Sequence, residues 1–222
     1  MPDSATLHGL IRAVTDADSS EALVAATHRL AASRQAAAAA TLVQVLGFNN
    51  PGAAVAAVDG LIALGQQAVP ALLDQLDPRN YGARAWAVRA LAGIGDVRGL
   101  ELLEEALATD VGPSVRRAAA RGLGQLRLAD LSAERRSELH ERCLRALEAA
   151  TADGEWVVRY AVATGLEGLA RDLGQNTAVG PVLGRARAAL QRLATGQAGG
   201  DLEEAPVVQL RARLALDRLP PP

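Results

Sequence analysis

The chain has 222 residues, of which 50% are hydrophobic and 22% are charged, a balance that fits a folded protein and excludes an intrinsically disordered one. Only 2% of the residues are aromatic, so the core must consist of Ala, Leu and Val, which favours packed helices over a β-sandwich. The net charge of -2 excludes an overall basic field, so nucleic acid is not expected as a partner. The longest uncharged stretch, Gln35–Val58, is broken at Asn49–Gly52, so no membrane insertion is expected.

Helices are predicted along the whole chain in three groups. Residues 6–16 are predicted to form an N-terminal cap helix, residues 19–195 a series of helix pairs, and residues 204–219 a C-terminal helix before the final prolines. Residues 1–222 are therefore expected to form a single HEAT-like repeat domain.

A short phrase anchored by a leucine recurs along the chain and reveals a repeat. Its clear copies are Val58–Gly65, Val88–Gly95 and Ala120–Leu126, anchored by Leu61, Leu91 and Leu123, and fainter copies are anchored by Leu30 and Leu166. The steps of 30 and 32 residues between the three clear copies are typical of one helix pair per repeat. The longer step to the last copy predicts an insertion within Arg127–Arg136.

A second amphipathic run follows the phrase, at Val69–Leu76 and at Leu100–Leu107. Apolar residues at helical spacing predict that both members of each repeat are helices. A single pair cannot bury its apolar face, so neighbouring pairs must stack. The sequence predicts an all-α fold, a right-handed solenoid of about five to six HEAT-like helix pairs.

Proline and glycine mark the ends of the predicted helices. Pro51 and Pro113 stand at helix starts, where a missing N–H is tolerated. Gly65 and Gly95 stand at helix ends, where a left-handed residue is commonly needed. Gln197–Gly200 is predicted to be a flexible internal loop.

Few residues point to catalytic chemistry. All basic side chains are arginine, which excludes a Schiff-base lysine and reflects either anion binding or an arginine-biased genome. The single cysteine, Cys143, and the absence of a signal-peptide pattern predict a cytoplasmic protein. His140 and Cys143 lie at helical spacing, but two ligands are fewer than a zinc site normally uses, so no metal is predicted.

The densest polar cluster is Asn80–Arg89. It contains Tyr81 and Trp86, and helical spacing places Arg84 on one side and Trp86 with Arg89 on another. This face suits a flat, anionic, conjugated ligand. The alternative is that Trp86 fills the core between repeats and Arg84 caps a helix or pairs with a neighbour.

Three charged residues occupy equivalent places in successive repeats: Asp59, Arg89 and Arg121. Such residues often form a structural polar ladder between repeats. Asp59 is alternatively a candidate proton donor in a ligand site.

Three stretches resemble a known family: Leu46–Val55, Asn80–Leu91 and Ser114–Gly124. Together they resemble the E/F-type phycobilin lyases of cyanobacteria, which are HEAT-repeat proteins, and the length is similar to that of the F-type, or beta, subunit. The phrase from Asn80 to Trp86 is the most specific part of the resemblance. The His-Cys motif of relatives that also isomerise the bilin is not found.

The resemblance implies an enzyme subunit that is active only with a longer E-type partner. Such a heterodimer attaches a linear tetrapyrrole, usually phycocyanobilin, to a cysteine of the phycocyanin alpha chain, with the bilin as substrate and no cofactor. In that reaction Arg84 or Arg89 would pair with the bilin propionates, Tyr81 and Trp86 would pack on its rings, and Asp59 would hydrogen-bond its pyrrole nitrogens.

Two other classes of function compete with this interpretation. One is a non-catalytic HEAT-repeat adaptor in phycobilisome assembly or degradation. The other is a general scaffold that binds protein partners along its concave face.

Overall fold

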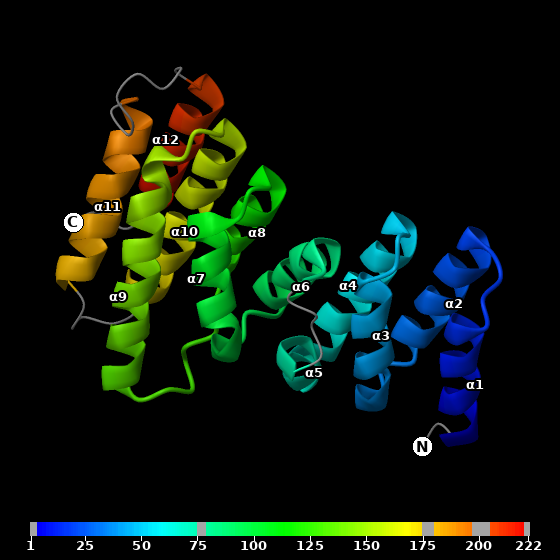
Figure 1. The fold of residues 1–222 in the computed structure, drawn as a ribbon. Helices are drawn as coiled ribbons and strands as arrows, with labels where there is room; N and C mark the ends of the chain where they lie inside the picture. The colour runs from blue at the N-terminus through cyan, green and yellow to red at the C-terminus, as the bar shows by residue number, and fades with distance from the viewer. Residues whose placement is uncertain (1–3, 75–78, 175–179, 197–204, 220–222) are drawn as a thin grey trace. The chain divides into compact units, whose positions relative to one another are not determined.

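The computed structural model describes residues 4–74, 79–174, 180–196 and 205–219, and every regular element in these ranges is a helix (Figure 1). The chain divides into two compact units, Met1–Gly99 and Leu100–Pro222, which are described separately below. This division does not by itself mark a domain boundary, because each repeat of a solenoid contacts mainly its neighbours. A single domain over residues 1–222 therefore stays a prediction.

The first unit contains short 3-10 turns and helices that pack as neighbouring pairs, α1 on α2, α3 on α4 and α5 on α6. Its helices are α1 (Ser4–Thr15), α2 (Ser20–Ala32), α3 (Ala39–Leu46), α4 (Pro51–Leu64), α5 (Val69–Asp74) and α6 (Tyr81–Ile94). The largest fully buried side chains of this unit are Ile94 and six leucines, Leu30, Leu42, Leu46, Leu61, Leu72 and Leu91.

Asparagine caps join successive repeats of this unit. The Oδ1 atom of Asn80 accepts a hydrogen bond from the backbone N–H of Ala83 at 3.0 Å, which caps α6, and its Nδ2 donates to the carbonyl oxygen of Gly47 at 3.4 Å. Asn50 caps α4 in the same way and donates to the backbone of Ser20. Each cap contributes about 1 kcal/mol, so these asparagines both start a helix and fix it to the preceding repeat.

The ends of α4 and α6 confirm the predicted punctuation. Pro51 is the first residue of α4, and Gly65 and Gly95 adopt positive φ angles of 61° and 71° at the ends of α4 and α6. The segment Pro51–Asp74 is long and apolar enough to cross a membrane, but half of that window is buried inside the protein. Because α4 packs against α2, α3 and α6, it is a core helix of the repeat.

The second unit also contains three pairs among its described residues, α7 on α8, α9 on α10 and α11 on α12. Its helices are α7 (Leu100–Thr109), α8 (Pro113–Leu123), α9 (Ala133–Ala149), α10 (Trp156–Gly174), α11 (Gly180–Ala194) and α12 (Pro206–Arg218). Its core includes Leu103, Leu123, Leu139, Leu144 and Leu147.

Glycines allow α8 and α10 to approach with their backbones in contact. A Cβ atom on Gly165 of α10 would lie 2.3 Å from the carbonyl oxygen of Ala120, and one on Gly168 would lie 2.2 Å from that of Gly124. Real Cβ atoms do not come this close to other heavy atoms. The α8–α10 crossing therefore requires glycine.

The all-α HEAT-like fold is confirmed, with small differences at the predicted boundaries. The cap helix begins at Ser4 rather than at residue 6, and the C-terminal helix ends at Arg218. The predicted insertion is only partly a loop, because Ala133–Arg136 form the first turn of α9, whose 17 residues exceed the 10 of α7. The loop predicted at Gln197–Gly200 lies outside the described residues.

Candidate functional site

The predicted aromatic and arginine cluster lies on α6 in the first unit. The guanidinium carbon of Arg89 lies 5.0 Å from the centre of the Trp86 ring, which is cation–π geometry. Arg89 and Tyr81 are exposed, and Trp86 is half-buried. The predicted shared side of Trp86 and Arg89 is confirmed, and the indole is not enclosed in the core.

The other two predicted residues lie apart from this stack. Arg84 is half-buried on α6, one turn before the fully buried Val88. Asp59 is exposed on α4, and among the described residues no hydrogen bond or ion pair joins it to Arg89. The predicted ladder between successive repeats is therefore not formed by these two side chains. Their roles toward a bilin stay predictions.

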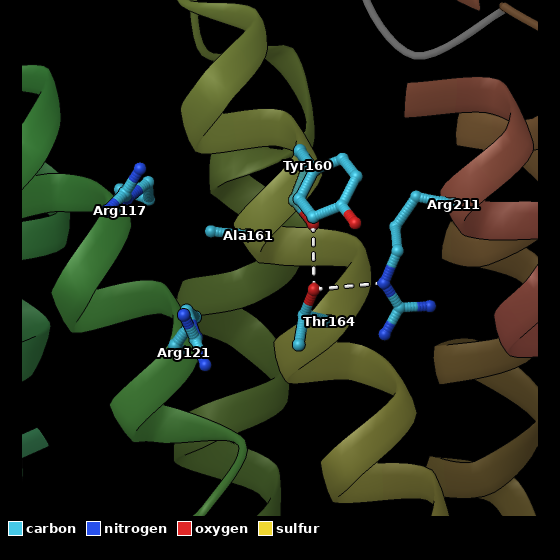
Figure 2. Close-up of a pocket in the computed structure, with 6 residues that line it drawn as sticks. All are labelled: Arg117, Arg121, Tyr160, Ala161, Thr164 and Arg211. Carbon is cyan, nitrogen blue, oxygen red and sulfur yellow. Dashed lines mark hydrogen bonds between the residues drawn. The ribbon is translucent and has the colours of Figure 1, made fainter. Parts of the chain in front are cut away.

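The second unit contains a pocket of about 300 Å³ that lies along α10, with α8 on one side and α12 on the other (Figure 2). Its lining consists of Arg117, Arg121, Tyr160, Ala161, Thr164 and Arg211. Among the described residues no carboxylate lines it, whereas three guanidinium groups do. Arg117, Arg121 and Tyr160 are exposed, so the pocket is open to solvent.

Arg211 is held at the α12 side of this pocket by three contacts. Its Nε donates to Thr164 Oγ1 at 3.1 Å, its Nη2 pairs with Glu167, and its guanidinium carbon lies 5.9 Å from the centre of the Tyr160 ring. The hydroxyl of Thr164 in turn donates to the carbonyl oxygen of Tyr160 at 3.1 Å, as Figure 2 shows. Tyr160 and Thr164 therefore orient Arg211 from one face of α10.

The charge of Glu167 is more than balanced by its neighbours. Its carboxylate is only 4% exposed and contacts Arg171 and Arg211, with Arg218 at 3.6 Å. One buried carboxylate thus lies among three guanidinium groups. The region of the pocket keeps a net positive charge.

The sequence alone does not predict this pocket, although the repeat contains a signal for most of its residues. The second residue of the recurring phrase is Asp59 or Arg89 in the first unit. In the second unit the same position is occupied by Arg121 and Thr164. Tyr160 and Arg117 lie one helical turn earlier on the same faces of α10 and α8. Arg121 belongs to a clear copy of the phrase and Thr164 to a fainter one, whereas Arg211 belongs to no recognisable copy.

The family of HEAT repeats matches residues 40–124 and 69–167. The chain is 52% identical over 197 residues to the "Bilin biosynthesis protein RpcF" of Synechococcus sp. strain WH8020, covering 89% of this chain and 88% of that protein. It is 54% identical over 162 residues to the "Phycocyanin alpha phycocyanobilin lyase CpcF" of Synechocystis sp. strain PCC 6803, covering 73% of this chain and 76% of that protein. The chain belongs to the F-type, or beta-subunit, family of phycobilin lyases.

A solved structure supports the same assignment for this F-type chain. It is similar, with a TM-score of 0.68 and 40% identity, to a chain in the complex of CpcE and CpcF of phycocyanin lyase from Nostoc sp. PCC7120. The match covers 82% of this chain and 99% of that one. The homologous chain was thus solved with an E-type partner.

The only cysteine of this F-type chain is not placed for chemistry. Burial is the main cause that raises the pKa of the Cys143 thiol to about 12, and Glu104 adds to the effect. His140 is also buried, and its Nε2 lies 2.6 Å from Asp172 Oδ2. Within the described ranges, no three His, Cys, Asp or Glu side chains are grouped to hold a metal ion.

Proposed function

We propose that this chain is the beta subunit of a lyase that, together with an E-type subunit, attaches phycocyanobilin to a cysteine of the phycocyanin alpha chain. The observation that carries the proposal is the 54% identity to the phycocyanin alpha phycocyanobilin lyase CpcF over three quarters of both chains. The similarity to a chain solved in a CpcE–CpcF complex supports activity in a heterodimer.

The reaction is an addition and requires no redox cofactor. The thiol of the acceptor protein bonds through sulfur to the ethylidene carbon of the bilin, the exocyclic double bond is lost, and the thiol proton ends on the bilin. Because the acceptor brings the nucleophile, the lyase needs no nucleophile of its own. Its contribution is to hold the two reactants in a reactive orientation, and such positioning accounts for several kcal/mol of a reaction barrier.

The face of α6 that carries Trp86 and Arg89, called the α6 face below, is suited to one part of this task. A bilin is flat, conjugated and carries two propionates, so an indole under a guanidinium offers it both an aromatic surface and a charge partner. In the proposed arrangement Trp86 and Tyr81 pack against pyrrole rings, while Arg89 or Arg84 pairs with a propionate. Asp59, exposed on the neighbouring helix α4, is the candidate for hydrogen bonds to pyrrole nitrogens.

The reaction would take place in the cytoplasm, in a reducing environment. A reducing compartment keeps the acceptor cysteine as a thiol, and the single cysteine of this chain fits such a compartment. Phycocyanobilin is the substrate in this proposal, and no resident cofactor is invoked.

Co-expression tests the proposed function. This chain, an E-type subunit, apo-phycocyanin alpha chain and a source of phycocyanobilin are expressed together, and covalent bilin is detected by zinc-induced fluorescence after denaturing electrophoresis. We expect a fluorescent alpha chain only when both subunits are present. A fluorescent alpha chain without this subunit, or none with both, would overturn the proposal.

Bilin transfer in the absence of this chain, the first of these outcomes, would favour an adaptor. A relative that is 50% identical over 211 residues, from Synechococcus elongatus, is named "Phycobilisome maturation protein". If bilin transfer never depended on this chain while phycobilisome assembly did, the non-catalytic adaptor would replace the lyase subunit.

A further inference from the structure

The pocket in the second unit contains a hydrogen-bond donor without an acceptor. The side chain of Arg211 is 9% exposed, and its Nη1 atom is buried with no hydrogen-bond partner among the described residues. A buried donor left unpaired costs free energy, so proteins rarely retain one without a reason such as a ligand or water. This donor belongs to a side chain that lines a solvent-open pocket.

The remaining charges of the pocket also favour an anion. Arg117 and Arg121 enter from α8, and no described residue forms an ion pair or hydrogen bond with either guanidinium. Glu167 does not fully neutralise the charge of Arg211, because its carboxylate also forms ion pairs with Arg171 and Arg218. The pocket therefore offers three guanidinium groups with one shared counter-charge.

The size and lining of the pocket fit a carboxylate on an aromatic or conjugated body, the kind of anion that a bilin carries. A volume of about 300 Å³ accommodates a side arm and part of one ring but not a whole tetrapyrrole. Tyr160 lies at the rim, exposed, with its ring beside Arg211, so a flat group can pack on it while a carboxylate reaches the guanidinium groups. Planar guanidinium forks match the two oxygens of a carboxylate.

We infer that the pocket formed by Arg117, Arg121, Tyr160, Thr164 and Arg211 binds a propionate carboxylate of the bilin substrate. This inference rests on the proposed function and adds to it a binding site in the second unit. Arg117, Arg121 and Arg211 contact the carboxylate, whereas Thr164 is a positioning residue that holds the Arg211 guanidinium through Nε.

The test compares phycocyanobilin with its dimethyl ester, which keeps the conjugated system and removes both negative charges. Binding of each ligand to the purified complex with the E-type subunit is followed by the change in bilin absorbance. The variants are Arg117→Gln and Arg121→Gln, chosen because both side chains are exposed and carry no structural ion pair. Arg145→Gln on α9 is the matched control, since it removes the same charge from another exposed site.

We expect each pocket variant to raise the Kd of phycocyanobilin about tenfold, the loss typical of one charge-assisted contact, and to leave the Kd of the ester unchanged. The control variant should bind both ligands as the wild type does. Equal affinity of the wild type for acid and ester, or equal weakening of both ligands by the variants, would overturn the inference.

Transfer of bilin to the apo alpha chain, measured in the same preparations, separates the two proposals. If the wild-type complex transfers no bilin, the proposed function is wrong. If it transfers bilin and the pocket variants bind and transfer it as well as wild type, only the assignment of the pocket is wrong.

Discussion

A Cβ atom on Gly124 would lie 2.1 Å from the carbonyl oxygen of Gly165, so α8 and α10 pack backbone against backbone. The helices can approach this closely only because both positions lack a side chain. This close approach also sets the distance between two walls of the pocket in the second unit. Arg117 and Arg121 line it from α8, and Tyr160 and Thr164 line it from α10.

Gly165→Ala is expected to lower the free energy of unfolding by about 3 kcal/mol, because the added methyl group must displace the backbone of α8. Gly184→Ala on α11 is the matched control: a Cβ atom added there would meet nothing within 4 Å, so alanine should raise the free energy of unfolding by about 0.5–1 kcal/mol. Urea unfolding measures both. Similar midpoints for the two variants would contradict the close approach.

Trp86→Ala and Arg89→Gln are expected to slow bilin transfer about three- to tenfold without unfolding the protein, because each removes one half of a partly exposed cation–π pair. The measurement is the initial rate of covalent bilin formation on the apo alpha chain. Arg29→Gln on α2, exposed in the same unit, is the matched control and should transfer at the wild-type rate. Unchanged rates in Trp86→Ala and Arg89→Gln would remove the α6 face from the bilin site.

Asp153→Asn is expected to lower the free energy of unfolding at pH 7 by about 1–3 kcal/mol. Asp153 accepts two hydrogen bonds from Arg116, at 2.7 and 3.0 Å, and both side chains are largely buried. Burial by itself raises the pKa of Asp153, but the hydrogen bonds from Arg116 and the backbone N–H of Glu155 outweigh it, and the pKa lies below its ordinary value of 3.8.

The same ion pair predicts a pH dependence with a defined sign. Because the pKa of Asp153 is lower in the folded state, its contribution is complete above the unfolded value and is lost as the pH falls through the folded value. The difference in the free energy of unfolding between the wild type and Asp153→Asn should therefore become smaller from pH 7 to about pH 3, as measured by urea midpoints. A difference that stayed constant would show that the carboxylate contributes no charge-dependent stability.

Cys143 is expected to be unreactive toward a thiol reagent at pH 8 until the protein unfolds, because its thiol is buried and its pKa is raised to about 12. We therefore expect that the chain does not compete with the acceptor protein for the bilin. Cys143→Ala should leave bilin transfer at the wild-type rate. Rapid labelling of the folded chain, or bilin bound covalently to it, would show that the thiol is accessible.

The outline of the fold could be predicted from the sequence because its signals are local. The prolines Pro51 and Pro113 at helix starts and the glycines Gly65 and Gly95 at helix ends report on single helices, and the leucine spacing reports on helix pairs; the structure confirms each of them. The stack of Arg89 on Trp86 was also predictable, since a separation of three residues places side chains on the same side of a helix.

The sequence by itself determined the helices, their repeat and one arginine–aromatic face, because the helices and the face depend on residues within a few turns and the repeat on the regular recurrence of one phrase. Only the tertiary structure decided that Arg211 meets Thr164 and Glu167 more than forty residues earlier, and that Arg121 lines the same pocket. The physical reason is that this pocket depends on how α8 and α12 pack against α10. That packing follows from which surfaces bury against each other, including glycines whose contact partners no local pattern reveals.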